Sequence, residues 1–214
     1  MARLPEDLER LLHDLRGPLN ALAMHAEVLK RVAADDPAAS ASVRTIQHET
    51  ERLSDMLVSA MGIVALERND SVRVDLRAVV EDAVAEARAK DAVVANGAWP
   101  TVSGDRRLLT HAITALIRNA AEATEGGGPG TPPPEISVVP GDGRVGVAVR
   151  DYGAGLRSTN PKVLIRLQSS TKPGHRGLGL IAAERIARLH GGTLTFESPG
   201  PGARVTLLVS SGRA

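Results

Sequence analysis

The chain of 214 residues has no cysteine and only three aromatic residues: Tyr152, Phe196 and Trp99. The lack of cysteine excludes a fold stapled by disulfides and is compatible with a reducing compartment. Because aromatic side chains are so scarce, we expect an aliphatic core. A formal net charge of only +1 argues against a broad basic surface, so no nucleic-acid partner is expected.

Long apolar runs are also absent. None approaches the roughly 20 residues that cross a bilayer, and the first residues lack the apolar stretch of a signal peptide. We therefore expect a cytoplasmic protein without direct membrane insertion. The composition, 43% apolar and 24% charged, is otherwise that of a globular protein. At about 100–200 residues per domain, the length allows one large domain or two small ones.

Two helical stripes occupy the first third of the chain. In the first, apolar residues recur at steps of three and four from Leu4 to about Ala34. The run Ala-Ala-Asp-Asp-Pro at 33–37 interrupts it. The second has heptad spacing and comprises Val43, Ile46, Thr50, Leu53, Leu57, Ala60 and Val64. This pattern predicts an antiparallel helical hairpin. Either two copies pair into a dimeric four-helix bundle, or both helices pack on the rest of the chain.

From Ser71 onward, short β-branched runs alternate with helical ones, which indicates a mixed α+β domain. Asp75 and Asp105 are expected to cap helices over 76–89 and 106–124, and a third helix ends at His190. A loop rich in glycine and proline covers 125–134. The predicted strands are 71–74, 93–95, 101–102, 136–139, 144–150, 193–197 and 203–209. We place the domain boundary between 1–68 and 69–214.

The first helix carries a histidine beside a carboxylate, His13 and Asp14. An imidazole in this position can act as a nucleophile at neutral pH, because the carboxylate orients the ring and stabilises its developing charge. A lone histidine on a polar helix face is usually an ordinary surface residue. Here Pro18 follows inside the apolar stripe, where it costs about 3 kcal/mol, and it indicates a local bend just after His13.

Three groups in the second domain have the chemistry of a nucleotide site. Asn119 offers an amide oxygen suited to a hard cation. Asp151 can accept a hydrogen bond from an amino group and is followed by Gly153 and Gly155. The Gly177-Leu178-Gly179 run opens a helix, where free backbone N–H groups suit phosphate. Each signal is weak alone, and their order along the chain strengthens them.

Together these motifs resemble the core of a two-component sensor histidine kinase, over nearly the whole chain. The run His-Asp-Leu-Arg-Gly-Pro at 13–18 resembles the phosphoacceptor box. The resemblance implies that His13 is phosphorylated, with Asp14 as its acidic helper, and that 1–68 is a dimerisation and histidine phosphotransfer hairpin. It also implies that 69–214 is a catalytic ATP-binding domain, an α/β sandwich of the histidine-kinase ATPase (Bergerat, GHKL) type.

The resemblance also assigns roles in the second domain. Asn119 sits where the family holds magnesium, and Asp151 where the family binds the adenine amino group. Gly153 and Gly155 complete that box. The end of the second glycine box, and with it the phosphates of ATP, is assigned to Gly177 and Gly179.

Three departures from the family pattern affect the same site. The second glycine box has His175 in its first position, with Gly174 one place early. Residues 161–168 lack the phenylalanine expected in the lid, although 169–172 resemble its polar segment, so Lys172 is expected to reach the phosphates. Ala115 stands where related gyrase-type ATPases have a water-activating glutamate. This favours transfer to His13 over hydrolysis.

The sequence thus predicts an ATP-dependent protein histidine kinase that uses ATP and Mg²⁺. As a homodimer it would autophosphorylate His13 and pass the phosphoryl group to an aspartate of a response-regulator receiver domain. Because the two domains fill the chain, the signal is expected from a separate sensor protein or from a region outside this sequence.

Two alternatives remain open. A non-catalytic histidine phosphotransferase with a decayed ATP-binding domain is favoured by His175 and the missing lid phenylalanine. An anti-sigma-type serine kinase would share the nucleotide fold but would not need the hairpin with its histidine box. A purely structural dimerisation module would leave the nucleotide residues unexplained.

Overall fold

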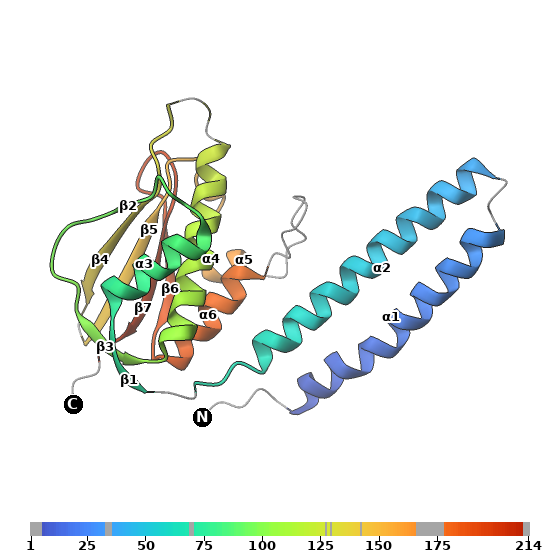
Figure 1. Cartoon of the computed structure of the whole chain (residues 1–214), viewed down its shortest axis with the longest axis horizontal. Helices are drawn as coiled ribbons and strands as arrows, with labels where there is room; N and C mark the ends of the chain where they lie inside the picture. Colours follow the sequence, from blue (N-terminus) through green and yellow to red (C-terminus); the bar gives the residue numbers. More distant parts are fainter. Residues whose placement is uncertain are drawn as a thin grey trace. The chain divides into compact units, whose positions relative to one another are not determined.

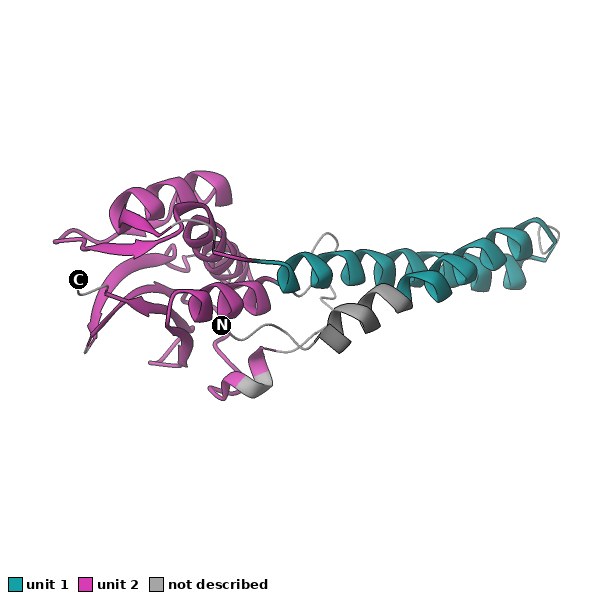
Figure 2. Ribbon diagram, turned by 90° about the horizontal axis from the view of Figure 1, so that it is seen from below, with its two compact units in different colours: residues 1–66, 169–178 teal, residues 67–168, 179–214 magenta. Residues whose placement is uncertain are grey.

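The computed structural model describes residues 6–32, 36–68, 71–126, 128, 130–141, 143–165 and 178–211; for 6–14, 162 and 163 it describes only the backbone. The chain forms two compact units, coloured separately in Figure 2. They divide between Leu66 and Glu67, and the second unit comprises 67–168 and 179–214. Among the described helices, none is both long and apolar enough to cross a membrane.

The first unit is a hairpin of two long helices, α1 (Glu6–Val32) and α2 (Pro37–Val64), which lie along each other (Figure 1). Asp36 caps α2, since its Oδ1 accepts from the N–H groups of Ala38 at 2.9 Å and Ala39 at 3.2 Å. Pro37 occupies the first helical position, where its missing N–H is no loss. The helix α1 continues through Pro18. The predicted hairpin is confirmed.

Only part of the predicted heptad seam is buried inside the hairpin. Val43, Thr50 and Leu57 are buried at intervals of seven residues on α2, and Ala26 is buried among the described side chains of α1, residues 15–32. The alternate seam residues Ile46 and Leu53 remain 44% and 48% exposed. A single hairpin therefore leaves part of this apolar stripe in contact with water.

The second unit contains two sheets and four helices among its described residues (Figure 1). The strands β1 (Val72–Asp75) and β3 (Thr101–Gly104) form an antiparallel pair. The larger sheet has the order β2-β4-β5-β7-β6, antiparallel except for β2 with β4. Its strands are β2 (Val93–Val94), β4 (Glu135–Gly141), β5 (Arg144–Arg150), β6 (Thr193–Glu197) and β7 (Arg204–Ser210).

The helices are α3 (Leu76–Ala87), α4 (Arg106–Glu125), the short α5 (Pro161–Leu164) and α6 (Gly179–Leu189). Figure 1 shows α3, α4 and α6 on one side of the larger sheet. The predicted α+β class is confirmed, and most of the predicted elements lie within two residues of their observed positions. The parallel pairing of β2 and the helix α5 were not predicted.

The core is aliphatic, as the composition indicates. Most side chains on the helix-facing side of the sheet are buried, and Phe196 is the one buried residue among the three aromatic residues, all of which the structure describes. Alternate residues of each strand face the opposite side. There, cross-strand pairing places four charged residues in one row across β4, β5, β7 and β6: Glu135, Arg150, Arg204 and Glu197.

His190 joins the end of α6 to the start of α4. Its ring is 2% exposed. Nε2 accepts from the Asp105 N–H at 3.0 Å, and Nδ1 lies 2.8 Å from the Ile186 carbonyl oxygen. Only the neutral ring with its hydrogen on Nδ1 satisfies both partners. Burial lowers the pKa of His190 below its usual value near 6.5, and the Arg68 charge adds to this; the Ile186 carbonyl and Asp105 act in the opposite direction.

We predict that this histidine makes the second unit sensitive to acid. Because the folded-state pKa lies below that of the unfolded chain, His190 contributes fully above about pH 6.5 and progressively less as the pH falls below it. The slope is at most about 1.4 kcal/mol per pH unit. Urea unfolding from pH 8 to 5, followed by Trp99 fluorescence, should give a flatter profile for His190→Gln than for the wild type. His111→Gln, an exposed matched control, should keep the wild-type slope; equal slopes in all three proteins would contradict the prediction.

Candidate functional site

The site is centred on Asp151, which follows the last residue of β5 and is 7% exposed. Its Oδ1 accepts from the N–H of Gly153 at 2.9 Å and from the N–H of Ala203 at 3.2 Å. Its own N–H donates to the Ala203 carbonyl at 2.9 Å. Among the described residues, none donates a hydrogen bond to Oδ2.

Close backbone approaches hold the Asp151 loop, residues 151–155. A Cβ at Gly153 would collide with the Ala123 carbonyl group near the end of α4. A Cβ at Gly202 would collide with the Asp151 carbonyl group, and Gly202 has a φ of +86°. Gly155 has a φ of +77°. Only glycine meets these demands without strain, so the loop packs closely against α4 and the β6–β7 turn.

Helix α4 connects this loop to the start of α6. Ala115, Asn119 and Ala123 are spaced by four residues and therefore lie on one face of the helix. A Cβ at Gly179, the first residue of α6, would lie 3.4 Å from the Ala115 Cβ. Gly153 contacts α4 at Ala123. Asn119 is exposed one turn from each contact. The structure thus brings the predicted residues 119, 151, 153 and 179 to one region.

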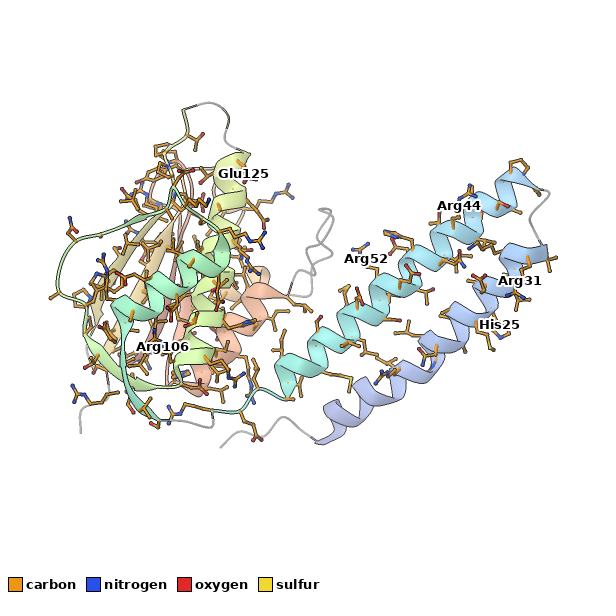
Figure 3. All side chains as sticks on the ribbon, viewed as in Figure 1. His25, Arg31, Arg44, Arg52, Arg106 and Glu125 are labelled. Atoms are coloured by element: carbon orange, nitrogen blue, oxygen red, sulfur yellow. The ribbon has the colours of Figure 1, made fainter. Side chains whose placement is uncertain are left out.

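Polar contacts fix α4 against α3. Arg118 Nη2 donates to the Glu86 carbonyl at 3.0 Å, and Thr114 Oγ1 donates to Glu86 Oε2 at 3.2 Å. At the beginning of α4, Arg106 pairs with Asp82 at 2.6 Å. Figure 3 labels Arg106 and Glu125 at the two ends of this helix. Arg118 is thereby held toward α3, and its neighbour Asn119 is left to solvent.

Some predicted site residues lie outside this description. His13 and Asp14 belong to α1, and only their backbone is described. Lys172 and Gly177 lie outside the described residues, as does His175. Of the predicted lid region, α5 and Ile165 are described.

Sequence reasoning missed three residues whose backbone contacts the Asp151 loop from outside: Ala123, Gly202 and Ala203. A signal for two of them is present in the run Ser-Pro-Gly-Pro-Gly-Ala at 198–203, whose alternating glycines indicate a tight turn. The sequence gives no comparable signal for Ala123, because Ala123 contacts the loop through its backbone carbonyl group, which every residue type has.

Comparison with known proteins identifies the family. Residues 104–212, about half of the chain, match the model of the histidine kinase-, DNA gyrase B-, and HSP90-like ATPase family. The chain belongs to this family.

Two curated sensor histidine kinases are similar over most of the chain. MtrB of Mycobacterium tuberculosis is 31% identical over 216 residues, covering 91% of this chain and 37% of MtrB. ZraS of Klebsiella oxytoca is 28% identical over 204 residues, covering 91% of this chain and 43% of ZraS. The chain therefore spans less than half the length of either relative.

Among solved structures, the ATP binding domain of PrrB from Mycobacterium tuberculosis superposes with a TM-score of 0.52 and 25% identity. The match covers 68% of this chain and 100% of the PrrB domain. These findings confirm the resemblance to a sensor histidine kinase core and the ATPase fold of its second unit.

Proposed function

We propose that the chain is an ATP-dependent protein histidine kinase that phosphorylates its own His13. One observation carries the proposal. In a chain of this ATPase family, the Asp151 loop and Gly179 contact α4 one turn on either side of Asn119, through Gly153 at Ala123 and through Gly179 at Ala115. These residues offer a carboxylate oxygen, an amide oxygen and the beginning of a helix, which suit the adenine, cation and phosphate parts of a magnesium nucleotide.

Each residue has a distinct part in binding. Asp151 accepts from the adenine amino group through Oδ2, because Oδ1 already accepts from the N–H groups of Gly153 and Ala203. Gly153 and Gly155 give the loop that binds the base its conformation, since Gly153 packs against the Ala123 carbonyl group and Gly155 has a positive φ. Gly179, with Gly177 and Lys172, binds the phosphates. Asn119 fits a magnesium ion, since its amide is exposed beside the phosphate end of the site. When bound, the ion offsets negative charge on the phosphate oxygens.

The transfer step uses His13 as the nucleophile. A ring nitrogen attacks the γ-phosphorus in line, and the bond from this phosphorus to the bridging oxygen breaks, so that ADP leaves with the electron pair. Asp14 orients the ring and takes up or stabilises the proton on the other nitrogen. The phosphoryl group then passes from His13 to an aspartate carboxylate of a response-regulator receiver domain.

A titration of the chain with ATP tests this function against its main rival. We expect saturable binding, followed by calorimetry, that is at least about tenfold tighter with Mg²⁺ than with excess chelator. A non-catalytic histidine phosphotransferase with a decayed nucleotide domain predicts no binding under either condition. ATP binding that is absent, or that is indifferent to magnesium, would contradict the proposed site.

We also propose that two hairpins pair as a homodimer. Leu15, Leu22 and Leu29 recur every seven residues on α1 and are about half exposed, and Ile46 and Leu53 continue the exposed surface on α2. Helical geometry places both stripes on the same side of the hairpin. Contiguous exposed apolar surface of this kind marks an interface, and a four-helix bundle would bury it.

The dimer is predicted to depend on this stripe. Leu22→Glu should shift the mass measured by light scattering from twice the chain mass of 22.4 kDa to the single chain, because an unpaired carboxylate in an apolar interface is strongly unfavourable. Met24→Glu is the matched control: Met24 is 62% exposed on the same helix but faces away from the stripe, and the dimer should persist. A monomeric wild-type chain, or equal behaviour of both variants, would refute the interface.

A further inference from the structure

The side chain of Tyr152 holds the Asp151 loop on the face of the sheet opposite to the helices. Tyr152 follows Asp151 directly, and its hydroxyl donates to Glu135 Oε2 at 2.8 Å. The centre of its ring lies 4.7 Å from the Arg150 guanidinium carbon. Glu135 begins β4 and Arg150 ends β5, and these two residues are cross-strand partners. The ring therefore ties the loop to the ends of two neighbouring strands.

The hydrogen bond from Tyr152 to Glu135 joins a neutral donor to a carboxylate acceptor. A hydroxyl that donates to a carboxylate forms one of the stronger hydrogen bonds in proteins. The hydrogen bond to Glu135 is the main cause that raises the pKa of Tyr152 above its usual value near 10, so the phenol remains a donor at physiological pH. The ring also stabilises the Arg150 guanidinium, which lies over its face. The buried Nε of Arg150 has no hydrogen-bond partner in the described structure.

The anchor completes the support of the Asp151 carboxylate. The β6–β7 turn holds this residue through the backbone of Ala203, and α4 limits Gly153 through the carbonyl group of Ala123. Both of these supports are backbone groups. The third side of the loop, toward β4, is held by the Tyr152 side chain. A side chain that neighbouring contacts already hold in its binding orientation loses less conformational entropy when the ligand binds, so the ligand binds more tightly.

We propose that Tyr152 is a positioning residue that holds Asp151 oriented toward the adenine amino group by bonding to Glu135 and stacking with Arg150. The inference rests on the proposed nucleotide site and deepens it. It gives Tyr152, which lies between Asp151 and Gly153, a role in the recognition of the base.

Binding of two nucleotides to the full chain tests the proposal. ATP carries the amino group that Asp151 is proposed to recognise, whereas inosine triphosphate carries an oxygen there. For Tyr152→Ala, we expect the Kd of magnesium-ATP to rise about tenfold and that of magnesium-inosine triphosphate to change by less than about twofold. Tyr152→Phe, which keeps the ring over Arg150 but loses the bond to Glu135, should weaken ATP binding by an intermediate factor.

The matched control is Glu197→Gln. Glu197 belongs to the same charged row and pairs with Arg204 at 3.2 Å, but it lies two strands away from β5. This variant should bind both nucleotides as the wild type does. An unchanged ratio of the two Kd values in Tyr152→Ala would overturn the positioning role, whether both affinities fall together or neither changes. A wild-type chain that binds neither nucleotide would overturn the proposed function itself.

Discussion

Replacement of Asp151 by asparagine is expected to weaken ATP binding about a hundredfold while the second unit stays folded. Asparagine keeps an Oδ1 that can accept from the N–H groups of Gly153 and Ala203, so the loop retains its internal bonds. The lost group is Oδ2, which becomes an NH₂ donor facing the adenine amino group. Loss of a charge-assisted bond and the opposition of two donors together account for about 3 kcal/mol.

Calorimetric titration with magnesium-ATP measures this effect, and Trp99 fluorescence during urea unfolding checks the fold. Asp82→Asn is the matched control, because Asp82 is an aspartate of the same unit that pairs with Arg106 outside the site. It should bind ATP as the wild type does. If Asp151→Asn bound ATP with wild-type affinity, the proposed adenine contact would be refuted.

Replacement of His13 by glutamine is expected to abolish labelling of the chain by γ-labelled ATP, a loss of at least about a hundredfold in rate. Glutamine has no ring nitrogen to attack the γ-phosphorus, yet it is a good helix former, so α1 should persist. ATP binding and the dimer should be unaffected, since neither is proposed to depend on the imidazole.

His25→Gln provides the control for this experiment. His25 is an exposed histidine of the same helix, twelve residues further along α1 (Figure 3), and its replacement should leave labelling unchanged. Labelling retained in His13→Gln, or lost equally in both variants, would refute the assignment of His13 as the phosphoacceptor.

Local features of this fold were predictable because they depend on neighbouring residues. The apolar stripes of α1 and α2 predict a hairpin, and an aspartate before an apolar stripe predicts a helix start. Asp75 and Asp105 do cap α3 and α4, accepting from the N–H groups of Arg77 and Leu108. The Asp151 and Asn119 motifs were recognisable for a similar reason, since each needs a particular residue type at a fixed place.

Features that depend on distant segments were not predictable. The order of the large sheet places β7 between β5 and β6, and nothing in the short strand runs encodes that choice. Ile46 and Leu53 of the α2 seam are exposed in one hairpin, which heptad spacing alone does not reveal. The contact of Tyr152 with Glu135 joins residues 17 positions apart through strand pairing, so the anchor appears only in three dimensions.

The most direct test of the central claim is the chemistry of the label after incubation with γ-labelled ATP and magnesium. A phosphoryl group on a histidine nitrogen is lost in acid and kept in base, so we predict an acid-labile, base-stable label on the wild-type chain. An acid-stable label would indicate a hydroxyl acceptor and a serine kinase. No label, with ATP bound, would contradict autophosphorylation and favour a phosphotransferase that receives its phosphoryl group from elsewhere.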